Sequence, residues 1–280
     1  MNTDTVSSDA PEEQPVSDCF GDFRCHVSVS PMQWFKKCPF RWYAHKVQHQ
    51  LDPGKPTRGL QIGKACHAEV EGAVNGKVAP EELSALARLS YDLIPSVSDW
   101  VPEFVLDHVD LGLVWPFYGK IDLLRYRGGQ LAFIDSKFAS EGKPPFPGGY
   151  RLLPKTKEAI QNDFQLCLYA AALQRIFGDL PATQGQNQVN YNTGERCVVE
   201  APCSQEAVSA AVEEAKNLCE SMDRMSRAPA WDVPTEGLPG QGPHCNAYGR
   251  PCETLRYCRE IEQSQLGGRS RTRPKTGWEI

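Results

Sequence analysis

The chain has 280 residues, 40% of them hydrophobic and 23% charged, a balance typical of a globular protein with one substantial core. It has no run near the roughly 18 apolar residues of a membrane span, and residues 1–18 lack the apolar stretch of a signal peptide, so we expect a cytoplasmic protein without membrane contact. The net charge of −5 argues mildly against a generally basic nucleic-acid-binding domain, but it leaves room for a local basic groove.

Helical patterns fill the first third of the chain. Ser30 followed by Pro31 is typical of a helix start, with serine as the N-cap and proline in the first turn. We expect a disordered leader at 1–27, and then helices that begin at Ser30, near Leu60 and near residue 80.

Strand patterns begin near residue 100. Arg127, Gly128 and Gly129 predict a tight hairpin turn between two of the strands. The expected elements from here on are strands at 103–110, 113–125 and 130–138, a helix at 156–178, strands at 186–192 and 196–201, and a helix from Ser204 to about residue 227. This order predicts an α/β fold with a small mixed sheet flanked by helices.

The hairpin carries the sharpest chemical pattern. Asp122 lies in the strand before the turn, and Asp135 and Lys137 lie two residues apart in the strand after it, on the same face. Both acids stand among apolar residues, where a carboxylate needs a partner, and a hard divalent cation such as Mg²⁺ or Mn²⁺ is a suitable one. Such a cation neutralises phosphate charge and activates water, which phosphodiester hydrolysis requires. An Asp-x-Lys pattern alone, however, is more often a surface ion pair.

Three further patterns accompany the hairpin. His67 follows Gly63 in a G-x-x-x-H element on a helix, Gly119 precedes Asp122 in a G-x-x-D element, and Gln165 and Tyr169 lie four residues apart on one helix face. Each has an ordinary structural explanation by itself. Their order along the chain is what favours a catalytic site.

In this order the motifs resemble those of the PD-(D/E)XK nuclease superfamily, in particular the RecB-type nuclease domain of the CRISPR-adaptation exonucleases and of their phage and mobile-element relatives. The resemblance covers about residues 30–260 and implies a restriction-endonuclease-like core. The implied roles are metal ligation by His67, Asp122 and Asp135, action on the attacking water by Lys137, and support of the site or DNA contact by Gln165 and Tyr169. The family often has an aromatic residue where this chain has Ser136, whose side chain we expect to face away from the site.

Glu103, at the start of the first strand, is a weaker candidate. An exposed strand-end carboxylate is the interpretation that we favour for it over a residue lining the site.

The eleven cysteines, odd in number and without a secretory signal, favour metal or cluster ligation by a subset over a disulfide framework. Cys38 near the start and Cys245, Cys252 and Cys258 near the end resemble the iron–sulfur clasp of the same nuclease relatives. Four thiolates suit a [4Fe–4S] cluster and also zinc. The six-residue gap after Cys245 is wider than the two or three that are commoner, and four unrelated buried thiols are the alternative. The nuclease domain with its clasp is expected at 28–262, followed by a flexible basic tail at 263–280.

A Pro- and Gly-rich loop after the third strand is the expected DNA contact. It carries Phe146 and Tyr150 for stacking on bases, and its basic residues for phosphates are Lys143, Arg151, Lys155 and Lys157. The function expected from motifs and resemblance is a DNA exonuclease acting on single strands or free ends in recombination, repair or mobile-element replication, together with recombination or adaptation proteins. The alternatives are a structure- or site-specific endonuclease and a catalytically silent, cluster-bearing DNA-binding subunit.

Overall fold

A computed structural model describes residues 26–47, 58–139 and 155–227. Its helices are α1 (Val29–Lys37), α2 (Pro39–Lys46), α3 (Arg58–Val74), α4 (Ala85–Tyr91), α5 (Lys157–Gln161), α6 (Phe164–Phe177) and α7 (Gln205–Arg227), with short 3-10 turns at Pro80–Glu82 and Val97–Asp99. Its strands are β1 (Trp100–Val109), β2 (Phe117–Arg127), β3 (Gln130–Ala139), β4 (Thr183–Asn190) and β5 (Arg196–Pro202). No helix in these ranges is both long and apolar enough to span a membrane.

The five strands form one mixed sheet in the order β1-β2-β3-β4-β5. The pairs β1–β2, β2–β3 and β4–β5 are antiparallel, whereas β3 and β4 run parallel, with α5 and α6 in the connection between them. A parallel pair needs such a crossover, because the chain must return to the end of the sheet where the first strand began before the second strand can start. The predicted α/β fold with a small mixed sheet flanked by helices is confirmed.

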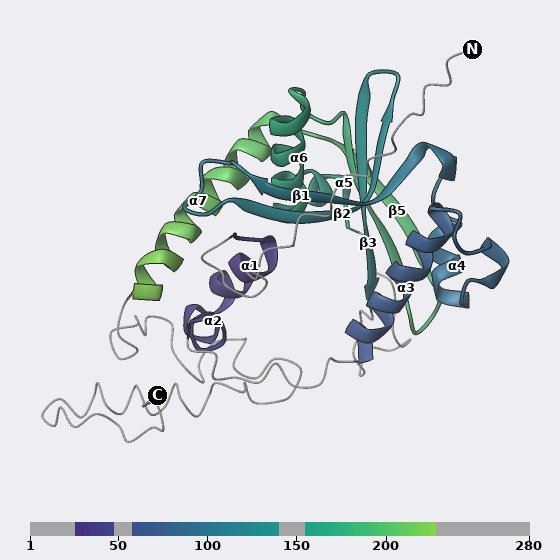
Figure 1. Ribbon diagram of the computed structural model, residues 1–280, viewed down its shortest axis with the longest axis horizontal. Coiled ribbons are helices and arrows are strands. Elements are labelled where there is room, and N and C mark those ends of the chain that lie inside the picture. Colours follow the sequence, from purple (N-terminus) through teal and green to yellow (C-terminus); the bar gives the residue numbers. More distant parts are fainter. Residues whose placement is uncertain (1–25, 48–57, 140–154, 228–280) are drawn as a thin grey trace, which may run out of the picture.

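Helices cover both faces of the sheet, and each face has its own apolar core (Figure 1). On one face α3 and α4 pack against Leu123 and Ile134. On the other face α6 packs against Leu124 and Phe133, and α7, α1 and α2 add further layers. Leu123 and Leu124 in β2, like Phe133 and Ile134 in β3, thus point into different cores, which explains why both members of each adjacent pair are apolar.

Two expected helices are each divided in two. The helix expected from Ser30 starts at Val29 instead, with Ser28 as its N-cap, and it is interrupted at Cys38. The interruption follows from Pro39, which disfavours helical backbone in the residue before it, and Cys38 is accordingly extended. The helix expected at 156–178 is interrupted at Asp163, whose carboxylate accepts hydrogen bonds from the amides of Gln165 and Leu166 and so starts α6 afresh.

The N-terminal end of the described chain is attached to the sheet. Val27, the last residue of the expected leader, is buried and forms a parallel bridge with Phe117 at the start of β2. The strand expected at 113–125 begins only there, directly after Pro116, which has no amide hydrogen to donate to a strand ladder.

Candidate active site

The two hairpin strands separate at the position of the two acids. Their ladder ends at the pair Leu123–Ile134, one residue before Asp122 and Asp135 would face each other. From there β2 continues beside β1, and β3 continues beside β4. The two carboxylates therefore lie in the fork between diverging strands, where polar side chains can be held by backbone and helix groups from both sides.

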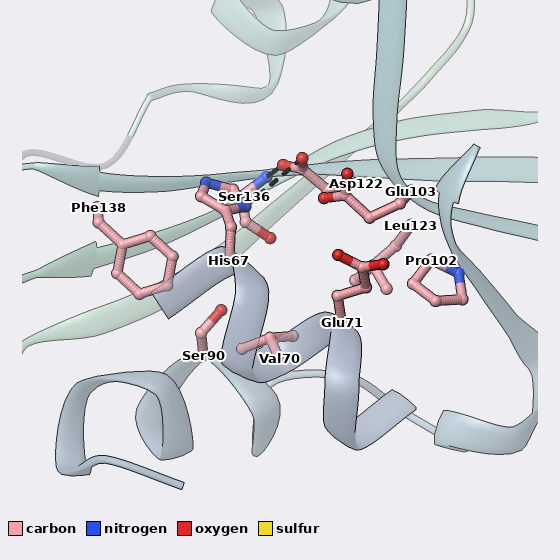
Figure 2. Close-up of a pocket in the computed structure, with 10 residues that line it drawn as sticks. All are labelled: His67, Val70, Glu71, Ser90, Pro102, Glu103, Asp122, Leu123, Ser136 and Phe138. Atoms are coloured by element: carbon pink, nitrogen blue, oxygen red, sulfur yellow. Dashed lines mark hydrogen bonds and ion pairs between the residues drawn. The ribbon is translucent and has the colours of Figure 1, made fainter. Parts of the chain in front are cut away.

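Asp122 lies at the centre of one cluster in this fork. Its Oδ1 is 3.5 Å from Nδ1 of His67 on α3, and its Oδ2 accepts a hydrogen bond of 2.6 Å from the backbone amide of Ser136. Figure 2 shows these groups in a small pocket, with the carboxylate of Glu103 next to that of Asp122. The ligating atoms of His67, Glu103 and Asp122 all lie within 4.8 Å of one another.

Glu103 belongs to this cluster, so its interpretation as an exposed strand-end carboxylate is wrong. It lies within β1, opposite Asp122, and only 14% of its side chain is exposed, in an ion pair with Lys120. Its backbone has φ of 57°, a conformation that is unfavourable for a residue with a side chain and that is enriched at functional sites. The irregular backbone turns the carboxylate toward the pocket. The regular alternation of side chains along a strand does not predict this orientation of Glu103.

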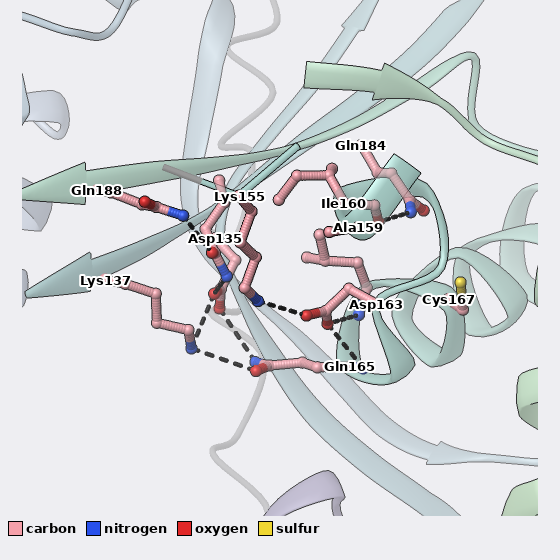
Figure 3. A network of polar contacts seen from close by, with 12 residues as sticks. Asp135, Lys137, Lys155, Ala159, Ile160, Asp163, Gln165, Cys167, Gln184 and Gln188 are labelled. Carbon is pink, nitrogen blue, oxygen red and sulfur yellow. Dashed lines mark hydrogen bonds and ion pairs between the residues drawn. The ribbon is translucent and has the colours of Figure 1, made fainter. Parts of the chain in front are cut away.

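Asp135 lies at the centre of a second cluster, toward α6 (Figure 3). Only 3% of the residue is exposed. Lys137 Nζ is 2.8 Å from Asp135 Oδ2 and donates to Gln165 Oε1 at 3.2 Å, while Gln165 Nε2 donates to Asp135 Oδ1 at 3.0 Å. The acid, the lysine and the glutamine thus form a closed triangle, which the sequence predicted only as a shared strand face plus a helix face.

The electrostatics of the fork suit a divalent cation. Burial and the nearby charge of Asp135 raise the pKa of Asp122 to about 7. Burial lowers the pKa of His67, which keeps its imidazole neutral and able to ligate. Two close carboxylates and a neutral imidazole, all largely shielded from water, are a donor set that Mg²⁺ or Mn²⁺ fits, since the cation offsets the repulsion between the carboxylates.

Lys137 remains charged in this setting. Burial works against its charge, but the carboxylates of Asp135, Asp122 and Asp163 outweigh burial and raise the pKa of Lys137. The lysine can therefore serve as a fixed positive charge and hydrogen-bond donor, but not as a proton acceptor near neutral pH.

Gly119 and Tyr169, from two different motifs, are packing partners. The Tyr169 hydroxyl accepts a hydrogen bond of 3.0 Å from Gln165 Nε2, and its ring is buried against the backbone of β2. A Cβ added at Gly119 would lie 2.7 Å from the Tyr169 ring, closer than real Cβ atoms approach. The glycine of G-x-x-D therefore makes room for the tyrosine that supports Gln165. A Cβ at Gly63, by contrast, would contact nothing within 4 Å.

The variant Gly119→Ala is accordingly expected to lower the free energy of unfolding by about 1–3 kcal/mol, as overpacking of a closed core does. Gly63→Ala, within α3, should raise it by about 0.5–1 kcal/mol, because alanine is the better helix former. Urea unfolding followed by circular dichroism measures both. Equal stability of Gly119→Ala and the parent protein would show that the contact with Tyr169 is not a constraint.

The remaining expected residues are divided between the described and undescribed parts of the chain. Cys245, Cys252, Cys258, Lys143 and Arg151 lie outside the described residues. Of the other expected DNA contacts, Lys157 is exposed at the start of α5, and Lys155 Nζ forms an ion pair of 2.7 Å with Asp163.

Cys38 is half-buried and caps α2, with its Sγ accepting a hydrogen bond from the amide of Arg41 at 3.4 Å. Two glutamines of β4, Gln186 and Gln188, also reach the site, and no motif had indicated them.

Comparison with known proteins agrees with this geometry. The family model of the PD-(D/E)XK nuclease superfamily matches residues 98–259, more than half of the chain, which includes both acids, Lys137, Gln165 and Tyr169. A solved structure described as "Crystal structure of SSO0001" aligns over 73% of this chain and 78% of that chain at 13% identity, with a TM-score of 0.39, a likeness too remote to bear on function. No curated protein matches the sequence. The matched region and the forked acidic site agree, and this chain belongs to the PD-(D/E)XK nuclease superfamily.

Proposed function

We propose that this protein is a divalent-metal-dependent deoxyribonuclease that degrades DNA from free ends or along single strands, in recombination, repair or mobile-element replication. The observation that carries the proposal is the fork between β2 and β3, in which Asp122, Asp135 and Lys137 converge with His67. Membership of a nuclease superfamily supplies the class of reaction.

The proposed metal ligands are His67, Asp122 and Asp135, with Glu103 as a further one. A bound Mg²⁺ or Mn²⁺ would supply an activated water and neutralise charge on the scissile phosphate. Lys137 would hold its positive charge beside that water and the phosphate, where it stabilises the negative charge that develops during hydrolysis. Gln165 would hold the side chains of Lys137 and Asp135 in position relative to each other, and Tyr169 would hold the side chain of Gln165.

The proposal for DNA binding depends on the segment that follows β3. This segment starts directly after Ala139 and ends at Lys155, whose ammonium pairs with Asp163 next to Gln165. The segment therefore leaves the strand that carries Asp135 and returns beside the helix that carries Gln165. Its sequence contains Lys143 and Arg151 for phosphates and Phe146 and Tyr150 for stacking on unpaired bases, which suits a strand without a partner.

A digestion assay with Mg²⁺ or Mn²⁺ distinguishes the enzymatic alternatives. Its three substrates are end-labelled linear single-stranded DNA, linear duplex DNA and covalently closed circular single-stranded DNA. We expect loss of the linear single strand from an end and resistance of the circle. Rapid cutting of the circle would assign the protein as an endonuclease instead. A protein that binds DNA but cuts none of the three substrates with either metal would be the silent subunit, although that alternative offers no chemical reason for retaining both acids and the lysine.

We also propose that Cys38, Cys245, Cys252 and Cys258 bind a [4Fe–4S] cluster. Cys38 stands between α1 and α2, and both helices pack on α7, from whose end the chain continues toward the other three cysteines. Ligation would join segments about 200 residues apart and so contribute to folding free energy, because the site exists only in the folded chain.

Anaerobically purified protein should contain iron and sulfide, and Cys38→Ala should lose both and unfold at a lower temperature. Cys219→Ala is the control, since Cys219 is fully buried against Met32 and should be no ligand. Stoichiometric zinc in a colourless protein would assign a zinc clasp, and a metal-free protein would rule out both.

A further inference from the structure

Strand β4 carries a row of buried glutamines that leads to the candidate site. Gln184, Gln186 and Gln188 alternate along the strand and share one face, and they are only 1%, 2% and 8% exposed. The parallel register places Gln186 beside Asp135 and Gln188 beside Lys137. Buried amides require hydrogen-bond partners, so the partners of this row indicate what it does.

Gln186 and Gln188 form a directed chain of hydrogen bonds that ends on Asp135. Cys197 Sγ on β5 approaches Gln188 Oε1 at 3.8 Å, Gln188 Nε2 donates to Gln186 Oε1 at 2.9 Å, and Gln186 Nε2 donates to Asp135 Oδ2 at 3.3 Å. An amide has one acceptor end and one donor end. Because Gln188 uses the oxygen of Gln186, the amide group of Gln186 must present its NH₂ to the carboxylate and cannot flip without breaking a bond.

This chain completes the set of donors around Asp135. Oδ1 accepts from Gln165, and Oδ2 accepts from Gln186 while it pairs with Lys137. Donors on both oxygens fix the plane of the carboxylate and so the directions in which its free lone pairs point.

We propose that Gln186 and Gln188 are positioning residues, which hold the Asp135 carboxylate in the orientation that the divalent cation needs. This inference rests on the proposed function, because it assumes that Asp135 contacts the cation. Neither glutamine touches the reacting atoms in this proposal. Gln186 acts directly on Asp135, and Gln188 acts by fixing the amide of Gln186.

Gln184 provides a matched control on the same strand. It is as buried as Gln186, but its amide nitrogen donates to the carbonyls of Ile160 and Gln161 at 2.7 and 3.2 Å, at the end of α5. Its contacts hold a helix in place and do not reach the site. If the row were merely core filling, replacement of any of the three glutamines would have the same kind of effect.

The experiment compares Gln184→Met, Gln186→Met and Gln188→Met, since methionine keeps the length of glutamine without its polar atoms. Mn²⁺ affinity is measured without DNA by electron paramagnetic resonance, thermal stability by calorimetry, and kcat and KM on linear single-stranded DNA. Gln186→Met should weaken Mn²⁺ binding by about 10- to 100-fold and lower kcat more than it raises KM, as the loss of a partner behind a metal ligand does. Gln188→Met should do the same to a smaller extent, and Gln184→Met should lower only the unfolding temperature.

Parent-like Mn²⁺ affinity in Gln186→Met would overturn the positioning role, as would an equal loss in Gln184→Met. Gln188→Met keeps the test decisive if Gln186→Met does not fold, because Gln188 lies nearer the surface. A parent protein that neither binds Mn²⁺ nor cleaves DNA would instead refute the proposed function itself, which separates the two failures.

Discussion

Replacement of Asp135 by alanine is expected to lower the cleavage rate by at least about 10²- to 10³-fold, the size of effect that follows loss of a strong electrostatic contact in the transition state. The same change should weaken Mn²⁺ binding, because Asp135 is proposed as a ligand. Both effects have one cause, the removal of a buried carboxylate from the fork between β2 and β3. Single-turnover cleavage and a Mn²⁺ titration on the same preparation measure them together.

Two controls separate chemistry from folding. Asp135→Asn preserves the size and shape of the side chain but removes its charge, so it should lose activity about as severely while retaining the fold. Asp107→Ala removes a carboxylate from the same sheet, where the side chain is 66% exposed beside His108 and outside the site, and it should cleave like the parent protein. Parent-like cleavage by Asp135→Ala would show that the site has been assigned to the wrong residues.

The relative placement of the motif residues could be predicted from the sequence, because it follows from periodicity. A turn at Gly128 and Gly129 fixes the register of the hairpin, and this register brings Asp122 and Asp135 to the same end of the ladder between the two strands. Alternation along β3 then places Lys137 on the face of Asp135, and the four-residue spacing of Gln165 and Tyr169 places both on the side of α6 that meets them. These positions require no knowledge of the tertiary structure beyond strand pairing and one packed helix.

Other parts of the site depend on features that periodicity does not contain. Glu103 reaches the cluster through a left-handed backbone in mid-strand, which only the surrounding structure can enforce. Gln186 and Gln188 are polar residues in a strand, where alternation normally indicates solvent, yet here the polar face is buried against α6 and the acids. The division of the expected helix at Asp163 did have a local sign, an aspartate before a run of apolar residues, which is a typical helix start.

Lys137 offers a prediction in which metal binding and catalysis move in opposite directions. Its ammonium lies 2.8 Å from Asp135 Oδ2, so in the metal-free protein it neutralises a carboxylate that the cation would need. Lys137→Ala should therefore bind Mn²⁺ at least as tightly as the parent protein. Its cleavage rate should nevertheless fall by about 10²- to 10³-fold, because the charge that stabilises the attacked phosphate is gone.

The comparison of Lys137→Ala with Asp135→Ala tests whether Asp135 binds the metal while Lys137 acts only in hydrolysis. The two variants should be equally inactive, but only Asp135→Ala should lose the metal. Lys77→Ala is the control for charge, since it removes an exposed lysine in the turn after α3, outside the site and the expected DNA contacts, and should leave both measurements near the parent values. If Lys137→Ala lost Mn²⁺ binding along with activity, the lysine would be a structural partner of Asp135, and the fixed positive charge for hydrolysis would have to come from another residue.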